Sequence, residues 1–334
     1  MTRYAITQIV SETTGTRIEN LVRLHGGLNS AVYAFTCAER RLIAKFYPTP
    51  DAGRDRLQQE YDAVTFLWHN GIRQIPAPFL CRPEKQLAIY AFVDGRGMPA
   101  DDIRTQDIDA ATAFIAGVNE LRAHSDAVTI GNASDAGYSP TQIADSIEHR
   151  IQTLRSAPAY ADASTGLAAF LEMDLVPAYQ TAAAAAREML DPMQELPLSH
   201  RVLSPSDFGF HNGLKSDYGW TFLDFEHFGW DDPAKIVCDF ALHPHPAMDI
   251  APKLKEKFRA SMQSIFSADT DLEARTDAYT PLFACKWACI LLNEFVPRHI
   301  ARRRHATDTA DLATTRKTQL AKAQRMLESA DALV

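Results

Sequence analysis

Two acids and an amide that could bind a metal ion or accept a proton occur close together in the sequence. Asp207 and Asn212 are five positions apart in LSPSDFGFHN, and Asp224 follows in LDFEHFGWDDP. Oxygen ligands of this kind suit Mg²⁺, and a carboxylate can accept a hydroxyl proton. Asp207 could instead cap a turn, and Asn212-Gly213 could form a hairpin corner. Asp224 favours the chemical interpretation, because a carboxylate inside the apolar run FLDF must be paired or coordinated.

These residues supply most of the parts that phosphoryl transfer requires, which are metal ligands, phosphate-binding cations and a carboxylate that orients the accepting hydroxyl. Asp207 would be the base, while Asn212 and Asp224 would bind Mg²⁺. A cation for the phosphates is available at Lys45 in RLIAKF, with Glu60 as its partner. Alone, Lys45 could be a solvent-facing strand residue and Glu60 a solvated helix charge. The ordered combination therefore carries the prediction.

Short strands and one helix are predicted for the first hundred residues. The runs AVYAFT (31–36) and RLIAKF (41–46) favour strands joined by a hairpin-length connection, and LAIYAFV (87–93) is a third apolar run. A helix that ends at Asn70-Gly71 is indicated by apolar residues at helical spacing, namely Leu57, Tyr61, Val64 and Trp68. We therefore expect a small antiparallel sheet and one helix that carry Lys45 and Glu60.

A segment with the composition of a linker, DGRGMPADD, follows the third apolar run. We place a domain boundary here, with a first domain over 1–93 and a second over 94–334. The second domain is predicted to be mainly helical. Two short strands, HRVL (200–203) and WTFLDF (220–225), are expected on either side of the loop that carries Asp207.

The composition is that of a globular protein, with 334 residues and 46% apolar content, which is ample for two lobes. The formal charge of −8 argues against general attraction to nucleic acid or anionic lipid. No stretch has the pattern of a signal peptide or a membrane span, so we expect a cytoplasmic location. The five cysteines are an odd number, which favours reduced thiols over a disulfide framework.

The segments SDFGFHN and LDFE resemble motifs of the aminoglycoside phosphotransferase and choline kinase superfamily, the small-molecule relatives of protein kinases. In that family a loop Asp is followed five residues later by Asn, and an [IL]-D-[WF]-E strand supplies a second metal ligand. Asp207, Asn212 and Asp224 match these positions. The downstream run GWDDPAKIVCDFA is similar to the family's G-D-P…D-L-A run, which implies chiefly structural roles for Asp232 and Asp239.

The first domain continues the resemblance in the family's order. LHGGLNSAVYAF is similar to the loop over the nucleotide phosphates, IAKF to the strand with the lysine, and QQEYDAVTFL to the helix whose glutamate pairs with it. The resemblance implies an α+β, two-lobed protein-kinase-like fold with a small antiparallel-sheet N-lobe and a mainly helical C-lobe, and it implies ATP and Mg²⁺ as cofactors. We expect contacts with the nucleotide from Lys45, Glu60, Gly27, Asn29, Ser30, Tyr90 and Phe92.

Two departures from the family pattern affect the site. Pro205-Ser206 stands where the family usually has His-Gly before the catalytic Asp, and in the kinase loop that His braces the backbone. The phosphate loop GGLNS holds adjacent glycines instead of a spaced pattern. Backbone N–H groups and the Ser30 hydroxyl could still bind a phosphate oxygen.

The implied activity is ATP-dependent phosphorylation of a hydroxyl on a small molecule, and a sugar, amino sugar, amino alcohol or nucleoside would fit equally. The acceptor would bind in the helical lobe. Aromatic and acidic groups could hold an ammonium there, and packing is an equal alternative for each of the candidates Glu226, Trp230, Asp231 and Glu294.

A second interpretation comes from another class of protein, a nucleotide-binding pseudokinase that acts as a regulatory or partner-binding module. The loss of His-Gly favours it, and the retention of Asp207, Asn212 and Asp224 opposes it. The run HPHP (243–246) has prolines on both sides of His245, which predicts a surface turn and disfavours a metal site.

Overall fold

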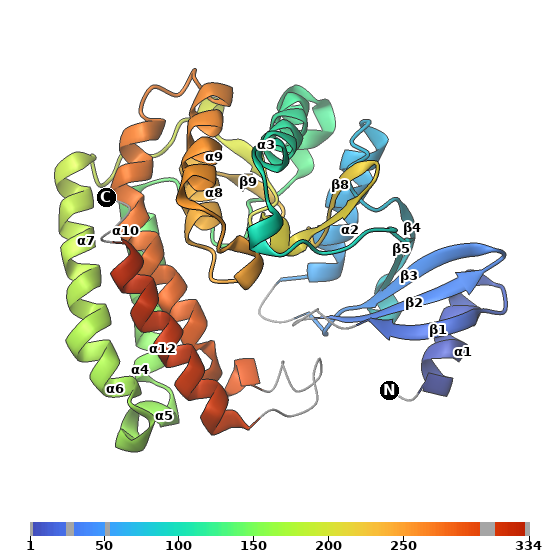
Figure 1. The fold of residues 1–334 in the computed structure, drawn as a ribbon, viewed down its shortest axis with the longest axis horizontal. Coiled ribbons are helices and arrows are strands. Elements are labelled where there is room, and N and C mark those ends of the chain that lie inside the picture. The colour runs from blue at the N-terminus through green and yellow to red at the C-terminus, as the bar shows by residue number, and fades with distance from the viewer. Residues whose placement is uncertain (1–2, 25–29, 51–53, 301–310, 331–334) are drawn as a thin grey trace.

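The chain folds into a sheet-containing N-terminal lobe and a mainly helical C-terminal lobe (Figure 1), in a computed structural model that describes residues 3–24, 30–50, 54–300 and 311–330. The N-terminal sheet has the order β1-β2-β3-β5-β4, with every neighbouring pair antiparallel. Its strands are β1 (Glu19–Leu24), β2 (Ala31–Cys37), β3 (Arg40–Phe46), β4 (Pro78–Arg82) and β5 (Leu87–Ala91). The expected two-lobed kinase-like architecture is confirmed.

The β2–β3 hairpin brings Lys45 to the middle of the sheet. Its connection is the pair Ala38 and Glu39, with φ of 47° and 66°. Positive φ at both positions matches the right-handed twist of the flanking strands in a two-residue turn. Lys45 lies opposite Val32 on β2 and Ala88 on β5, so its backbone is held on both sides.

Helix α2 (Arg56–His69) forms where the apolar spacing predicted a helix. The Asp55 side chain caps it by accepting a hydrogen bond from the Gln58 N–H at 3.0 Å. Apolar side chains on one face are buried, and Glu60, only 4% exposed, lies among them. The helix therefore carries a carboxylate into an apolar interface, where it needs a partner.

The C-terminal lobe is built around the long helix α10 (Leu272–Leu291), which packs against α4, α7, α8 and α12. Its other helices with described bounds include α3 (Thr105–Glu120), α4 (Pro140–Arg155), α5 (Pro158–Ala161), α6 (Leu167–Phe170), α7 (Val176–Met189), α8 (Pro233–Leu242), α9 (Pro252–Ile265) and α12 (Leu312–Ala330). Two small antiparallel sheets pair β6 (Val202–Ser204) with β9 (Gly229–Asp231), and β7 (Gly213–Ser216) with β8 (Gly219–Phe222).

The buried apolar side chains form two clusters. The larger one fills the C-terminal lobe and also includes the apolar face of α2. The smaller one lies between the N-terminal sheet and helix α1 (Arg3–Thr14), which contributes Ile6 and Val10. All five cysteines are free, as expected. None of the helices in the described ranges is both long and apolar enough to cross a membrane.

Candidate active site

The loop that carries Asp207 is anchored at its start by a buried amide. In β6, just before the loop, the Leu203 N–H donates to Asn119 Oδ1 at 2.9 Å, and Asn119 Nδ2 donates to the Leu203 carbonyl at 3.0 Å. Phe208 and Phe210 are buried and direct the apolar side of the loop into the core. Asp207 keeps a side chain that is 34% exposed, so its carboxylate remains accessible.

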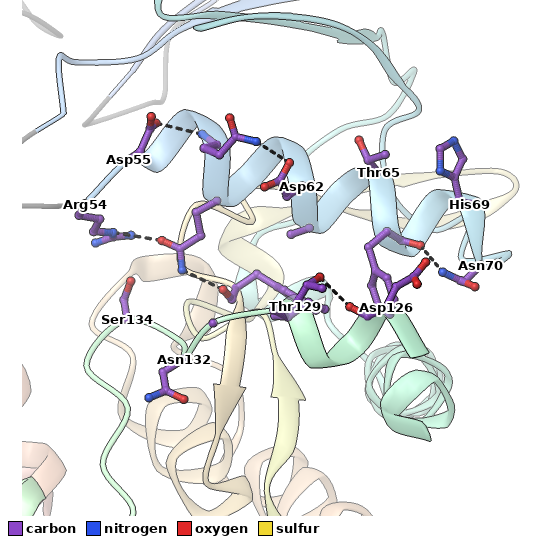
Figure 2. A pocket seen from close by; sticks show the side chains of 17 residues that line it. Arg54, Asp55, Asp62, Thr65, His69, Asn70, Asp126, Thr129, Asn132 and Ser134 are labelled. Carbon is purple, nitrogen blue, oxygen red and sulfur yellow. Dashed lines mark hydrogen bonds between the residues drawn. The ribbon is translucent and has the colours of Figure 1, made fainter. Parts of the chain in front are cut away.

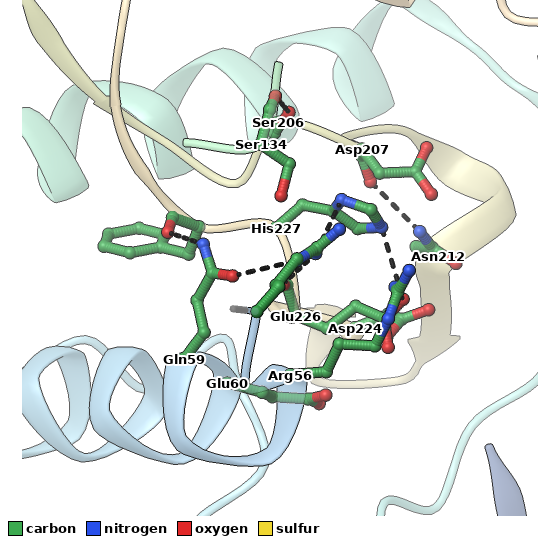
Figure 3. A network of polar contacts seen from close by, with 12 residues as sticks. Arg56, Gln59, Glu60, Ser134, Ser206, Asp207, Asn212, Asp224, Glu226 and His227 are labelled. Carbon is green, nitrogen blue, oxygen red and sulfur yellow. Dashed lines mark hydrogen bonds and ion pairs between the residues drawn. The ribbon is translucent and has the colours of Figure 1, made fainter. Parts of the chain in front are cut away.

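Hydrogen bonds connect Asn212 to the backbone of Asp207 and to Leu223, the residue before Asp224. Asn212 Nδ2 donates to the Asp207 carbonyl at 3.0 Å, and the Leu223 N–H donates to the Asn212 carbonyl at 2.7 Å. Asp224 follows with a φ of 65°, the left-handed conformation that a short polar side chain tolerates. The structure thus brings the three motif residues together (Figure 3).

Lys45 joins the sheet, α2 and the Asp224 segment. Its Nζ atom lies 2.7 Å from Glu60 Oε2 and 2.8 Å from Asp224 Oδ1. Burial alone would lower the pKa of Lys45, but Asp224 and Glu60 raise it well above its usual value. Burial raises the pKa of Glu60 to about 7 although Lys45 opposes this shift. Lys45 is therefore a cation fixed between two carboxylates. Glu60 is buried, whereas the side chain of Asp224 is 36% exposed.

A second group of polar contacts holds α2 against the segment after Asp224 (Figure 3). Arg56 pairs with Glu226, the Arg54 guanidinium donates to the Glu226 carbonyl at 2.6 Å, and Gln59 Nε2 donates to the Phe228 carbonyl at 2.8 Å. Burial would raise the pKa of Glu226, but His227, Lys45 and Arg56 hold it well below its usual range. These contacts place Glu60 beside Lys45 by fixing the helix that carries it.

Two histidines contact the Asp207 carboxylate. His211 Nε2 and His243 Nε2 each lie 3.1 Å from Asp207 Oδ1. Burial would raise the pKa of Asp207, but these two hydrogen bonds hold it well below its usual range. Asp207 is thus an ionised carboxylate at neutral pH.

The remaining residues expected at the nucleotide have different surroundings. Ser30 is buried, and its hydroxyl has no hydrogen-bond partner among the described residues. The Tyr90 hydroxyl lies 3.1 Å from that of Tyr47, and the Arg41 guanidinium stacks 3.7 Å from the centre of the Phe92 ring. Gly27 and Asn29 lie outside the described residues.

The four acceptor candidates are buried or have partners within the protein. Glu226 is 1% exposed and paired with Arg56, while Asp231 is fully buried and paired with Lys235 at 2.8 Å. The Trp230 indole N–H donates a hydrogen bond to the Ala127 carbonyl at 3.1 Å, and Glu294 is buried, with 4% exposure. The contacts of these residues support the packing alternative.

The two aspartates of the downstream run have protein partners as well. Asp232 caps α8 by accepting from the Ala234 N–H at 2.8 Å, and it also pairs with Arg275 at 3.1 Å. Asp239 lies 3.2 Å from the Lys235 ammonium. These contacts fit the structural roles that the resemblance implies.

A cavity of about 660 Å³ lies between α2 and the segment 126–134 (Figure 2). On the helix it is lined by residues that include Gln58, Gln59, Ala63 and Phe66, and it is closed by residues of the segment 126–134. Glu60 does not line it. The cavity is therefore separate from the cluster of Lys45, Asp207 and Asp224.

Sequence reasoning missed Arg56, His211 and His243. His211 had a signal, because it lies four residues after Asp207 in the quoted motif. The run HPHP was expected to be a surface turn, which holds for exposed His245 but is wrong for His243, whose side chain is 10% exposed. The contact between Asp207 and His243 depends on tertiary packing, so no pattern in the neighbouring sequence indicates it.

No protein-family model matches the sequence, and no curated protein matches it either. Solved structures match over nearly the whole chain. Spectinomycin phosphotransferase APH(9)-Ia, in complex with ADP and spectinomycin, has a TM-score of 0.65 at 12% identity, and the match covers 96% of this chain and 98% of that chain. Choline kinase from Cryptosporidium parvum has a TM-score of 0.59 at 12% identity, with 99% of both chains covered.

A third match is the gentamicin complex of APH(2")-IIa, with a TM-score of 0.61 at 15% identity and coverage of 98% of this chain and 99% of that chain. At these identities the similarity establishes the fold. The chain has the two-lobed fold of aminoglycoside phosphotransferases and choline kinase, so the resemblance seen in the motifs is confirmed at the level of the fold.

Proposed function

We propose that the chain is an ATP-dependent phosphotransferase that phosphorylates a hydroxyl of a small molecule. The observation that carries this proposal is the convergence of Lys45, Asp224 and the Asp207 loop, which come from a strand and two loops that are distant in sequence. One fold hosts many functions, so the site residues carry the argument.

The donor set fits Mg²⁺. One carboxylate oxygen from each of Glu60, Asp224 and Glu226 lies within 4.8 Å of the other two, and hard oxygen ligands of this kind suit Mg²⁺. Glu60 and Glu226 are buried against Lys45 and Arg56, whereas the Asp224 side chain is 36% exposed, so we assign Asp224 and the amide oxygen of Asn212 as the ligands. Magnesium bound here would neutralise charge on the phosphates of ATP.

The chain's own residues would perform three tasks. Lys45, held by Glu60, would bind a phosphate oxygen of the nucleotide. The buried Ser30 hydroxyl is available for a second contact of that kind. Asp207, which is ionised and partly exposed, would orient the acceptor hydroxyl and receive its proton.

Steady-state ATP turnover with a panel of sugars, amino sugars, amino alcohols and nucleosides tests the proposal. An acceptor should raise turnover above the acceptor-free rate and give a product heavier by one phosphoryl group. With that acceptor, Asp207→Asn should lower kcat by about 10²–10⁴-fold, the usual contribution of a positioned general base, and leave ATP affinity nearly unchanged.

One result would contradict the proposed function, and another would contradict the role of Asp207 as base. ATP binding without transfer to any acceptor class would favour the pseudokinase alternative. Loss of ATP binding in Asp207→Asn would mean that Asp207 holds the metal site or the fold instead of serving as the base.

A further inference from the structure

One oxygen of the Asp207 carboxylate accepts hydrogen bonds from two stacked imidazole rings. His211 and His243 both approach Oδ1 through Nε2, at 3.1 Å each. Their rings are 3.8 Å apart at an interplanar angle of 20°. Within the described residues, Asp207 Oδ2 makes no hydrogen bond.

The backbone fixes which nitrogen of His243 carries the proton. The His245 N–H donates to His243 Nδ1 at 3.2 Å, so Nδ1 must be the unprotonated acceptor. Nε2 then carries the hydrogen and donates it to Asp207. A carboxylate only accepts, so His211 must also donate through Nε2. In this tautomer Nδ1 of His211 is an acceptor, and it is buried with no partner among the described residues.

The run HPHP builds the turn that makes this contact. Pro244 and Pro246 have fixed φ angles, and the chain continues into a short 3₁₀ helix (Pro246–Met248). The Ala247 N–H donates to His245 Nδ1 at 3.1 Å, which closes the next turn. The donor to His243 thus comes from a segment with little conformational freedom.

Helix α10 limits rotation of the His243 ring from the other side. The Trp287 ring packs edge-on against it, with centroids 4.6 Å apart and an interplanar angle of 69°. The Trp287 indole N–H is itself held by Asp239 Oδ1 at 3.0 Å. His243 therefore has a fixed tautomer and a restricted ring.

We propose that His211 and His243 are positioning residues that hold Asp207 through Oδ1 and leave Oδ2 for the acceptor hydroxyl. The inference rests on the proposed phosphotransferase function and extends it. A carboxylate held by two donors cannot rotate about its terminal bond without losing both, so Oδ2 keeps one direction. The two imidazoles would brace the catalytic side chain in a loop where Pro205-Ser206 replaces the family's His-Gly.

A pair of matched variants tests the role of His243. His243→Phe keeps a ring against His211 and Trp287 but removes the donor, whereas His243→Gln restores a donor of similar reach. We expect His243→Phe to lower kcat about tenfold or more with KM for ATP unchanged, since a hydrogen bond to a charged group is lost. His243→Gln should recover most of that loss.

A double-mutant cycle shows whether His243 acts through Asp207. Once Asp207→Asn has removed the carboxylate, adding His243→Phe should lower kcat no further. An equal further fall in the Asp207→Asn background would overturn the inference. Wild-type kcat in His243→Phe would overturn it as well.

The contact is also measurable without any acceptor. Two-bond ¹H–¹⁵N correlation spectra of the histidine side chains in the full chain should show Nε2–H tautomers for His211 and His243, and both sets of resonances should shift in Asp207→Asn. An Nδ1–H tautomer of either histidine would overturn the inference, whatever the enzyme's activity. Resonances that do not shift in Asp207→Asn would overturn it as well. Absence of phosphoryl transfer by the wild type would instead overturn the proposed function. The spectra would still show whether the histidines contact Asp207.

Discussion

At the residue scale, the two assigned metal ligands differ in charge. Asp224→Ala should weaken the Mg²⁺-dependent binding of ATP about tenfold or more, because a carboxylate attracts a dication as a full charge. Asn212→Ala should weaken it less, because an amide offers only a dipole. Titration of ATP at several Mg²⁺ concentrations measures both effects.

The matched control for this comparison is Asp217→Ala. Asp217 is an exposed acid in the turn between β7 and β8, so its loss changes the net charge equally without touching the site. Its ATP binding should be that of the wild type. The same Mg²⁺ dependence in Asp224→Ala and the wild type would remove Asp224 as a ligand.

His243 should also make stability depend on pH. Burial lowers its pKa, with Asp207 and Asp239 opposing this shift and His211 adding to it. The unfolded chain therefore binds a proton at this position more readily than the folded chain does. The stabilising contribution is complete above the unfolded pKa of about 6.5 and falls as the pH drops below it.

Denaturant unfolding at pH 8, 7, 6 and 5.5 measures this effect. The free energy of unfolding should fall less steeply with acid in His243→Phe than in the wild type, whatever the absolute stability of the variant. His149→Phe is the control, because His149 is exposed on α4, and it should keep the wild-type slope. Equal slopes for His243→Phe and the wild type would contradict the prediction.

The sequence indicated residues of the candidate site only where a pattern lies within a short segment. Asp207 and Asn212 have a fixed spacing within one loop, and Asp224 is an acid inside an apolar run, so sequence patterns indicated all three. The cationic partners of Asp231 and Glu226 come from tertiary packing, so composition alone did not indicate these two ion pairs.

At the element scale, α2 is fastened to the segment that follows Asp224. Among these contacts, the Arg56 ion pair should contribute most to stability, since its partner Glu226 is 1% exposed. Breaking a buried ion pair costs about 3–5 kcal/mol when the remaining charge has no other partner. His227 Nε2, 3.2 Å from the same carboxylate oxygen, reduces the cost here. We therefore expect Arg56→Ala to lower the free energy of unfolding by about 1–3 kcal/mol.

The control for Arg56→Ala is Lys257→Ala, which breaks a surface pair with Asp109 whose side chains are 34% and 59% exposed. An exposed pair contributes about 0–1 kcal/mol. Denaturant titration compares the two variants at one pH. Equal losses would mean that the Arg56 pair does not fasten α2.

Elements were easier to predict than their mutual positions. The helix at 56–69 and the strands around Lys45 follow from local periodicity and β-branched content. The contact of Lys45 with Asp224 joins positions 179 apart, and no local pattern encodes it. The family resemblance supplied that long-range arrangement.

At the scale of the whole molecule, the buried apolar side chains of the described residues form two clusters. The apolar face of α2 belongs to the large cluster of the C-terminal lobe, while α1 and the face of the N-terminal sheet that it covers form the small one. Elements with few buried contacts open at lower free energy than the main core. The small cluster should therefore be able to open without the large one.

Two matched substitutions test this division. Ile6 on α1 is 1% exposed in the small cluster, and Ile115 on α3 is fully buried in the large one. Each Ile→Ala change removes the same atoms and should cost about 2–5 kcal/mol where it acts. In native-state hydrogen exchange, Ile6→Ala should speed exchange in α1 and β1–β3 and leave α3 and α10 protected. Ile115→Ala should reduce protection throughout the chain, since the large cluster spans both lobes. Equal acceleration of α10 by both variants would mean that the two clusters unfold as one unit.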